Sequence, residues 1–142
     1  MIESYVGPVS HLASNSGWGA ATKGNNALRR AWHPVCIASD LREKPLPVRL
    51  FGEALVVVRL GDEIAAFPDL CVHRGTALSL GWIDAGSAPA PDGTPATGEP
   101  CLVCPYHGWS YASDGEVRRI PAVHGRAIPR RARVERYATA EH

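Results

Sequence analysis

Two short segments of the chain each place a cysteine close to a histidine. One residue separates Cys71 from His73, and two residues separate Cys104 from His107. Each segment follows a stretch with strand character, so each of two loops would supply one thiolate and one imidazole. Thiolates and imidazoles are ligands for both zinc and iron. The sequence therefore predicts a metal site with four protein ligands.

This set of ligands suits a [2Fe-2S] cluster in which two thiolates hold one iron and two neutral imidazoles hold the other. Neutral imidazoles leave less negative charge at the cluster, and its reduction potential should therefore lie within roughly −150 to +300 mV. Gly75 and Gly108 would let the backbone come close to the inorganic sulfides, where N–H groups can donate hydrogen bonds. Pro105 has no N–H group and would stiffen its loop.

A mononuclear structural zinc site is the alternative, because zinc accepts the same four donors. Zinc modules favour two cysteines separated by two residues, and Cys101 forms such a pair with Cys104. Zinc has no need of the neighbouring glycines or of the C-x-H spacing. We interpret Cys101 and Cys36 as buried thiols outside the site, since each lies in a short apolar stretch. The sequence thus favours the cluster over zinc.

The segments CVHRG and CPYHGW resemble the two cluster-binding boxes of Rieske proteins, specifically those of the Rieske non-haem iron oxygenases. The resemblance covers roughly residues 30–142 and implies a Rieske-type [2Fe-2S] cluster. Its ligands would be Cys71, His73, Cys104 and His107. Respiratory Rieske proteins carry two further cysteines where this chain has Thr76 and Tyr106, and a hydrogen-bonding serine where it has Trp109. Without that serine, the potential should lie toward the low end of the range.

The resemblance also implies an electron-transfer module. It would take single electrons from an NAD(P)H-dependent reductase or an acidic ferredoxin. It would pass them to the mononuclear iron of an oxygenase catalytic domain or subunit, in a hydroxylase or demethylase system. Two alternatives remain open, namely a Rieske domain fused to a reductase and a free Rieske ferredoxin.

A catalytic iron of that kind needs two histidines and one carboxylate. The histidines outside the two boxes are scattered along the chain and show no such grouping; they are His11, His33, His124 and His142. We therefore expect no complete catalytic site in this chain.

The sequence around the two boxes has the pattern of an all-β protein. Short apolar and β-branched runs alternate with Gly-containing connections that suit hairpins. The expected strands span residues 32–38, 48–51, 54–60, 63–68, 102–103, 109–112, 116–120 and 134–139. This pattern predicts a Rieske-type antiparallel sandwich or barrel with two cluster-binding loops.

The chain divides into three parts. Residues 1–29 are rich in Gly, Ser and Asn and show no periodicity, so we expect a flexible N-terminal arm. Residues 30–142 would form the domain. Within it, residues 84–100 contain four prolines and almost nothing large and apolar, which predicts an exposed, mobile insertion between the two boxes.

Composition excludes several classes of function. The 142 residues carry 15 Lys and Arg against 14 Asp and Glu, so no general positive field favours nucleic acid. No apolar run approaches the roughly 20 residues that span a bilayer, and no signal peptide is evident, so we expect a cytoplasmic protein without a membrane partner. Residues 116–142 hold seven arginines and three acidic residues. They are either a solvated face or a docking surface for an acidic electron carrier or a partner subunit.

Overall fold

The middle of the molecule is an antiparallel sheet of three strands, β3 (Leu46–Leu50), β4 (Glu53–Leu60) and β5 (Glu63–Pro68). The computed structural model describes residues 3–8, 28–123 and 126–142. Two-residue turns join the three strands, because Leu50 pairs with Glu53 and Leu60 pairs with Glu63. The Gly-containing connections in the sequence predicted both hairpins.

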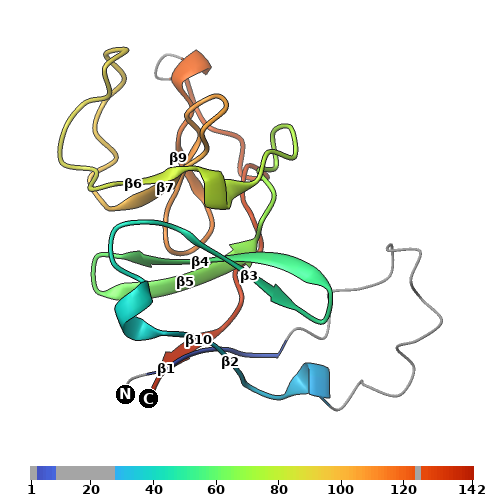
Figure 1. The fold of residues 1–142 in the computed structure, drawn as a ribbon. Helices are drawn as coiled ribbons and strands as arrows, with labels where there is room; N and C mark the ends of the chain where they lie inside the picture. The colour runs from blue at the N-terminus through green and yellow to red at the C-terminus, as the bar shows by residue number, and fades with distance from the viewer. Residues whose placement is uncertain (1–2, 9–27, 124–125) are drawn as a thin grey trace.

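Both faces of this central sheet are buried. On β4, Val56 and Val58 belong to one hydrophobic cluster, whereas Leu55 and Val57 belong to a second cluster on the opposite face. Successive side chains on a strand point to opposite faces, so the continuous apolar run of β4 serves both clusters. The protein therefore has three layers, with β3–β5 between two other sheets (Figure 1).

One outer layer has the strand order β10-β1-β2, formed by β1 (Glu3–Val6), β2 (His33–Ile37) and β10 (Thr139–Glu141). The prediction of a flexible arm is wrong for β1, which is the central strand of this sheet. A strand of four residues is too short to show a period in the sequence, and its pairing depends on two distant segments. The rest of the predicted arm, residues 9–27, lies outside the described residues.

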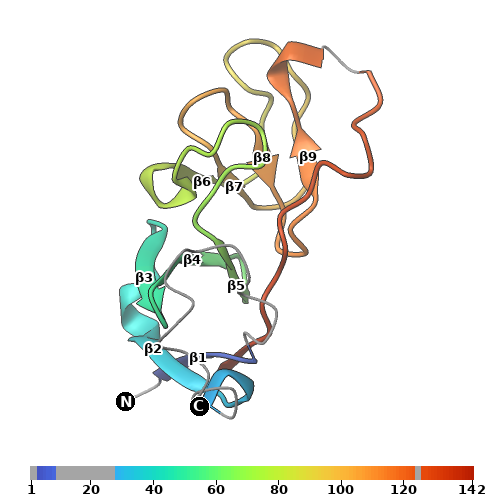
Figure 2. The same cartoon turned by 90° about the vertical axis from the view of Figure 1, so that its right-hand side faces the viewer.

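The other outer layer has the order β6-β7-β8-β9, formed by β6 (Trp82–Asp84), β7 (Cys101–Val103), β8 (Ser110–Tyr111) and β9 (Val117–Arg119). The chain then runs down one side of the molecule from β9 to β10 (Figure 2). On the way, Tyr137 N donates to Ala66 O over 2.9 Å. The strand predicted at residues 134–139 is therefore displaced, since β10 begins only at Thr139.

The remaining elements are short 3₁₀ turns, namely η1 (Leu28–Arg30), η2 (Ala38–Asp40), η3 (Leu78–Leu80) and η4 (Pro121–Val123). The described residues contain no α-helix, and every strand pairing among them is antiparallel. The predicted all-β class is confirmed. No helix in this part of the chain has the length and apolar character needed to cross a membrane.

The insertion at residues 84–100 joins β6 to β7, and most of its residues are exposed. Its two ends are held together, because Gly98 N donates to Gly86 O over 3.0 Å. Thr94 is buried, and both its N–H and its hydroxyl donate to Asp92 Oδ1. The insertion is thus an exposed loop with internal structure of its own.

Candidate metal centre

The first of the two ligand-bearing loops spans residues 71–76, directly after the segment that follows β5. Two backbone hydrogen bonds close it. Cys71 N donates to Thr76 O over 2.8 Å, and Gly75 N donates to Cys71 O over 2.8 Å. Gly75 has φ +71°, a conformation that side chains other than glycine rarely adopt. The sequence CVHRGT therefore folds locally into a tight loop that presents His73.

The second loop spans residues 104–109 and connects β7 to β8. The same two hydrogen bonds close it, because Cys104 N donates to Trp109 O over 2.9 Å and Gly108 N donates to Cys104 O over 3.1 Å. Gly108 has φ +70°. The two loops therefore share one backbone design, in which a cysteine is followed four residues later by a left-handed glycine.

The two thiols lie at the buried base of the loops. Cys71 is 3% exposed and Cys104 is 2% exposed, and both belong to the hydrophobic cluster between the central sheet and β6–β9. Burial raises the pKa of the Cys104 thiol, and a hydrogen bond with Cys71 raises it further. The two sulfurs thus stand side by side, as two ligands of one iron must.

The two imidazoles lie at the exposed tips of the same loops. The rings of His73 and His107 have centroids 4.7 Å apart and planes inclined by 60°. Desolvation, followed by the neighbouring His107 and Arg74, lowers the pKa of His73. These effects favour the neutral imidazole, which is the form that binds a metal.

Two aromatic rings from the second loop lie against the imidazoles. The Trp109 ring stacks on His73 with 4.7 Å between centroids and only 5° between planes. The Tyr106 ring lies 3.8 Å from that of His107, at 37°. Sequence analysis placed Trp109 beside a ligand box but could not show that it covers the histidine of the other loop.

Tyr111 on β8 contacts the first loop, and the sequence analysis did not predict this contact. Its hydroxyl oxygen lies 3.0 Å from Cys71 Sγ and accepts a hydrogen bond from Val72 N over 3.3 Å. Burial, followed by the bond to Cys71, raises the pKa of Tyr111, so the phenol stays protonated and its hydrogen can be donated to the sulfur. The only signal in the sequence was a tyrosine two positions after Trp109, on the same face of the strand that leaves the second loop.

The donor set fits a two-iron cluster with divided ligation. Two buried thiols form one pair and two exposed imidazoles form the other. No group of three or more His, Cys, Asp or Glu side chains surrounds a single ion position in the described part of the chain. Cys101 lies outside this arrangement, on β7, with its Sγ donating to Glu99 O over 3.5 Å.

Several large apolar side chains in and near the two loops are exposed. In the described residues, five of the exposed large apolar side chains come from the two loops and their neighbours; they are Leu70, Val72, Leu80, Trp82 and Tyr106. We call these five the apolar rim. Exposed apolar side chains that form one contiguous patch often mark a surface that a partner covers.

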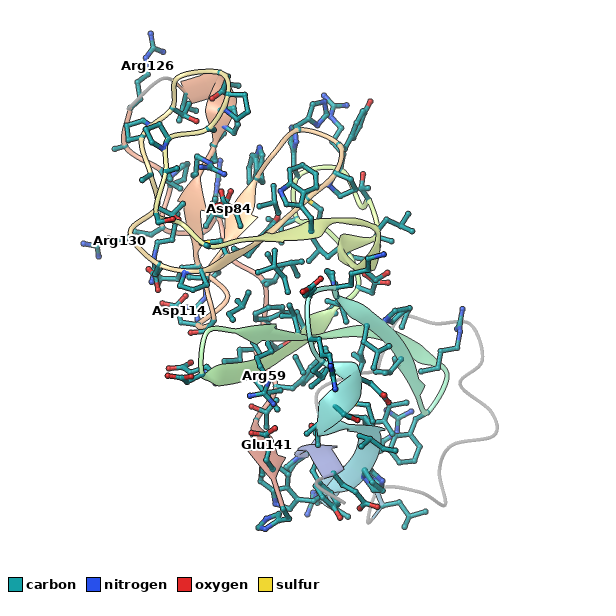
Figure 3. The ribbon with its side chains drawn as sticks, turned by 60° about the vertical axis from the view of Figure 1, so that its left-hand side comes forward. Arg59, Asp84, Asp114, Arg126, Arg130 and Glu141 are labelled. Carbon is teal, nitrogen blue, oxygen red and sulfur yellow. The ribbon has the colours of Figure 1, made fainter. Side chains whose placement is uncertain are left out.

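Some arginines of the basic C-terminal segment form ion pairs within the chain and are therefore less available to bind a partner. Arg118 bonds to Glu99, Asp114 and Glu116, and Arg119 bonds to Asp84. In contrast, Arg126 and Arg130 point outward from the body of the molecule (Figure 3). Arg131 is likewise exposed. The docking-surface prediction therefore narrows to these exposed arginines beyond β9.

Comparison with known proteins gives a consistent picture. The family model described as "Rieske [2Fe-2S] domain" matches residues 31–137. The chain is 38% identical over 120 residues to methylxanthine N1-demethylase NdmA of Pseudomonas putida, covering 80% of this chain and 30% of that protein. It is 35% identical over 116 residues to methylxanthine N3-demethylase NdmB of the same organism, covering 78% of this chain and 30% of that protein.

Solved structures agree with the sequence comparisons. The structure of NdmA from P. putida CBB5 superposes with a TM-score of 0.64 at 38% identity, covering 80% of this chain and 32% of that chain. The chain thus spans about a third of the length of these relatives, and it matches the part that resembles a Rieske domain.

Proposed function

Because the chain belongs to the Rieske [2Fe-2S] domain family and carries a Rieske-type [2Fe-2S] cluster, we propose that it relays single electrons from a reductase to the mononuclear iron of an oxygenase. The oxygenase would be a hydroxylase or a demethylase, as the names of the similar demethylases suggest. It would be a catalytic domain of the same chain or a separate subunit.

The ligands of the proposed cluster are the four residues of the two loops. Cys71 and Cys104 would hold the inner iron, and His73 and His107 would hold the outer iron. The observation that carries this assignment is the pairing of two buried thiols beneath two exposed imidazoles. When bound, the cluster supplies one-electron redox chemistry.

The chain's own residues then control access to the site. Trp109 and Tyr106 cover ring faces of the imidazoles and limit contact with water there. Tyr111 holds the sulfur of Cys71 from the buried side. Because the imidazoles are exposed and the thiols are buried, His73 and His107 would be the ligands through which a bound cluster exchanges electrons with a partner.

The partners follow from this surface. The proposed electron donor is an NAD(P)H-dependent reductase or an acidic ferredoxin that docks on the apolar rim, assisted by the exposed arginines beyond β9. Charge complementarity of this kind raises the association rate and weakens with salt. We place the domain at residues 30–142 together with strand β1, and the protein in the cytoplasm. A Rieske domain fused to a reductase and a free Rieske ferredoxin would use the same surface.

The test is the reduction kinetics of the purified chain, which should contain about two irons and two acid-labile sulfides. An acidic [2Fe-2S] ferredoxin, chemically reduced, is mixed with it in a stopped-flow instrument at low and high ionic strength. We expect the double variant R130E/R131E to slow reduction about tenfold at low salt and to leave the spectrum intact.

The matched control is R42E/R49E, which makes the same change of charge at two exposed arginines, one between η2 and β3 and one on β3, outside the C-terminal segment. If both double variants slow the reduction equally, the slowing is caused by the change in net charge and not by the loss of a docking surface at Arg130 and Arg131. A preparation with iron and sulfide that accepts no electron from any one-electron donor would contradict the proposed function itself.

A further inference from the structure

In the described part of the chain, one acidic side chain is buried, and it lies close to a cluster ligand. Asp69 is 8% exposed and stands between the end of β5 and the first loop, two residues before Cys71. Two residues of chain span at most about 7 Å, so the Cα atoms of Asp69 and Cys71 lie within that distance. Burying a carboxylate costs free energy. The position of Asp69 therefore points to a role at the neighbouring ligand.

The partner of the Asp69 carboxylate is Ser79 of η3, which lies just beyond the same loop. Ser79 N donates to Oδ1 over 2.7 Å, and Ser79 Oγ donates to Oδ2 over 2.6 Å. The backbone of Asp69 is fixed as well, because its N–H donates to Ala54 O on β4 over 3.0 Å. These bonds connect the two ends of the first loop. They hold the carboxylate in one place relative to Cys71.

The negative charge of Asp69 has no cation beside it. Each oxygen accepts a hydrogen bond, as the oxygens of an ionised carboxylate do. No Lys, Arg or His side chain in the described residues forms an ion pair with Asp69. Arg74 of the loop is exposed, so water and salt screen its charge. A buried charge is screened much less, and Asp69 is therefore a fixed negative charge next to the site.

We propose that Asp69 lowers the reduction potential of the cluster by holding this negative charge beside the ligand Cys71. Reduction adds one electron, and a nearby anion disfavours the more negative state. A lower potential makes the reduced cluster a stronger electron donor to the mononuclear iron of an oxygenase. The inference rests on the proposed function, because it concerns the same cluster, and it adds the residue that sets the driving force.

The test is the midpoint potential of the cluster-containing full chain with Asp69→Asn, measured by spectroelectrochemical titration. The amide has nearly the shape of the carboxylate; its oxygen can accept from Ser79 N and its NH₂ group can donate to Ser79 Oγ. The substitution therefore removes the charge and retains the contacts. We expect the equilibrium constant for reduction to rise about tenfold, which is about 59 mV for one electron. An unchanged or lower potential overturns the inference.

Two control variants separate the buried charge from other causes. Asp62→Asn makes the same change of charge at an exposed position directly before β5, whereas Asp69 directly follows β5. Asp69→Glu retains the charge but alters the contacts with Ser79. Both should keep the potential of the wild type. An equal rise in Asp62→Asn would assign the effect to net charge, and an equal rise in Asp69→Glu would assign it to the hydrogen bonds. Either result overturns the inference.

A second pair of variants decides if Asp69→Asn does not retain the cluster. Ser79 is partly exposed, so Ser79→Lys can bring an ammonium group to the carboxylate, and Ser79→Gln is the control of similar length without the charge. A higher potential in Ser79→Lys than in Ser79→Gln supports the inference, and equal potentials overturn it. The proposed function is tested separately, because the reduction of the wild-type chain by ferredoxin is measured without these variants.

Discussion

The two ligand-bearing loops share one backbone design but obtain their support from different places. Each is closed by the same pair of hydrogen bonds and by a left-handed glycine four residues after the cysteine. The first loop is held from outside, by the Tyr111 hydroxyl on Cys71 and Val72 and by the Trp109 ring on His73. In the second loop, the ring that contacts the histidine comes from the loop itself, because Tyr106 lies against His107.

The second loop and β8 therefore support the first loop, whereas the first loop gives no such support in return. Trp109 and Tyr111 both lie directly after the second histidine, yet both act on ligands of the first loop. Substitutions in the second loop should therefore disturb both halves of the site. Substitutions in the first loop should disturb only one.

The ligands themselves should be equally necessary in both loops. Replacing Cys71 or Cys104 by serine removes one of two thiolates from the inner iron, so we expect less than about a tenth of the cluster to remain in either variant. Iron and acid-labile sulfide analysis with the visible spectrum measures this. Cys36→Ser, on β2, is the control and should keep the full cluster. Full occupancy in either ligand variant would remove that cysteine from the site.

The two glycines should differ when each is replaced by alanine. A left-handed backbone costs an alanine about 1–2 kcal/mol at either position. A Cβ on Gly108 would lie 3.1 Å from Pro121 Cγ, whereas a Cβ on Gly75 would find Leu70 Cδ2 at 3.9 Å. We therefore expect Gly108→Ala to lower the free energy of unfolding more than Gly75→Ala, as measured by urea denaturation.

Adding Pro121→Ala to Gly108→Ala separates the two causes. If the contact with the proline ring is the extra cost, the double variant should lose less stability than the two single changes predict together. Equal losses for Gly75→Ala and Gly108→Ala would show that the backbone conformation alone decides.

The sequence predicted the parts of this structure that depend on local signals. Strand β5 was predicted with its observed bounds at residues 63–68, because an apolar run lies between two turn signals. Strands β1 and β6 were missed, since pieces of three or four residues carry no period and are defined by distant partners. The motif spacing predicted two ligand-bearing loops. That Trp109 reaches His73 depends on how the loops pack, which no local pattern encodes.

Removing the Tyr111 hydroxyl should shift the potential through the first loop alone. The donated hydrogen bond stabilises the more negative, reduced state, so Tyr111→Phe should lower the midpoint potential. A hydrogen bond of about 1 kcal/mol corresponds to about 40 mV for one electron. A spectroelectrochemical titration measures the shift. Tyr106→Phe is the control, because it retains the ring on His107 and because no hydrogen bond joins the Tyr106 hydroxyl to a sulfur in the described part of the chain. An equal shift in potential in that variant would show that the hydrogen bond to Cys71 is not the cause.

The smallest effect is expected at Cys101, which tests whether any ligand lies outside the two loops. Its thiol is fully buried on β7, its pKa is raised by burial, and its hydrogen is directed at Glu99 O rather than at the other sulfurs. Serine keeps a donor at this position but is smaller and more polar, so Cys101→Ser should lower the free energy of unfolding by about 1 kcal/mol. The visible spectrum, iron content and potential should stay as in the wild type, because neither loop loses a contact. A bleached spectrum in Cys101→Ser, with the cluster retained in Cys71→Ser, would mean that the second loop alone holds the metal with the C-x-x-C pair. The assignment of one thiolate and one imidazole to each loop would then be wrong.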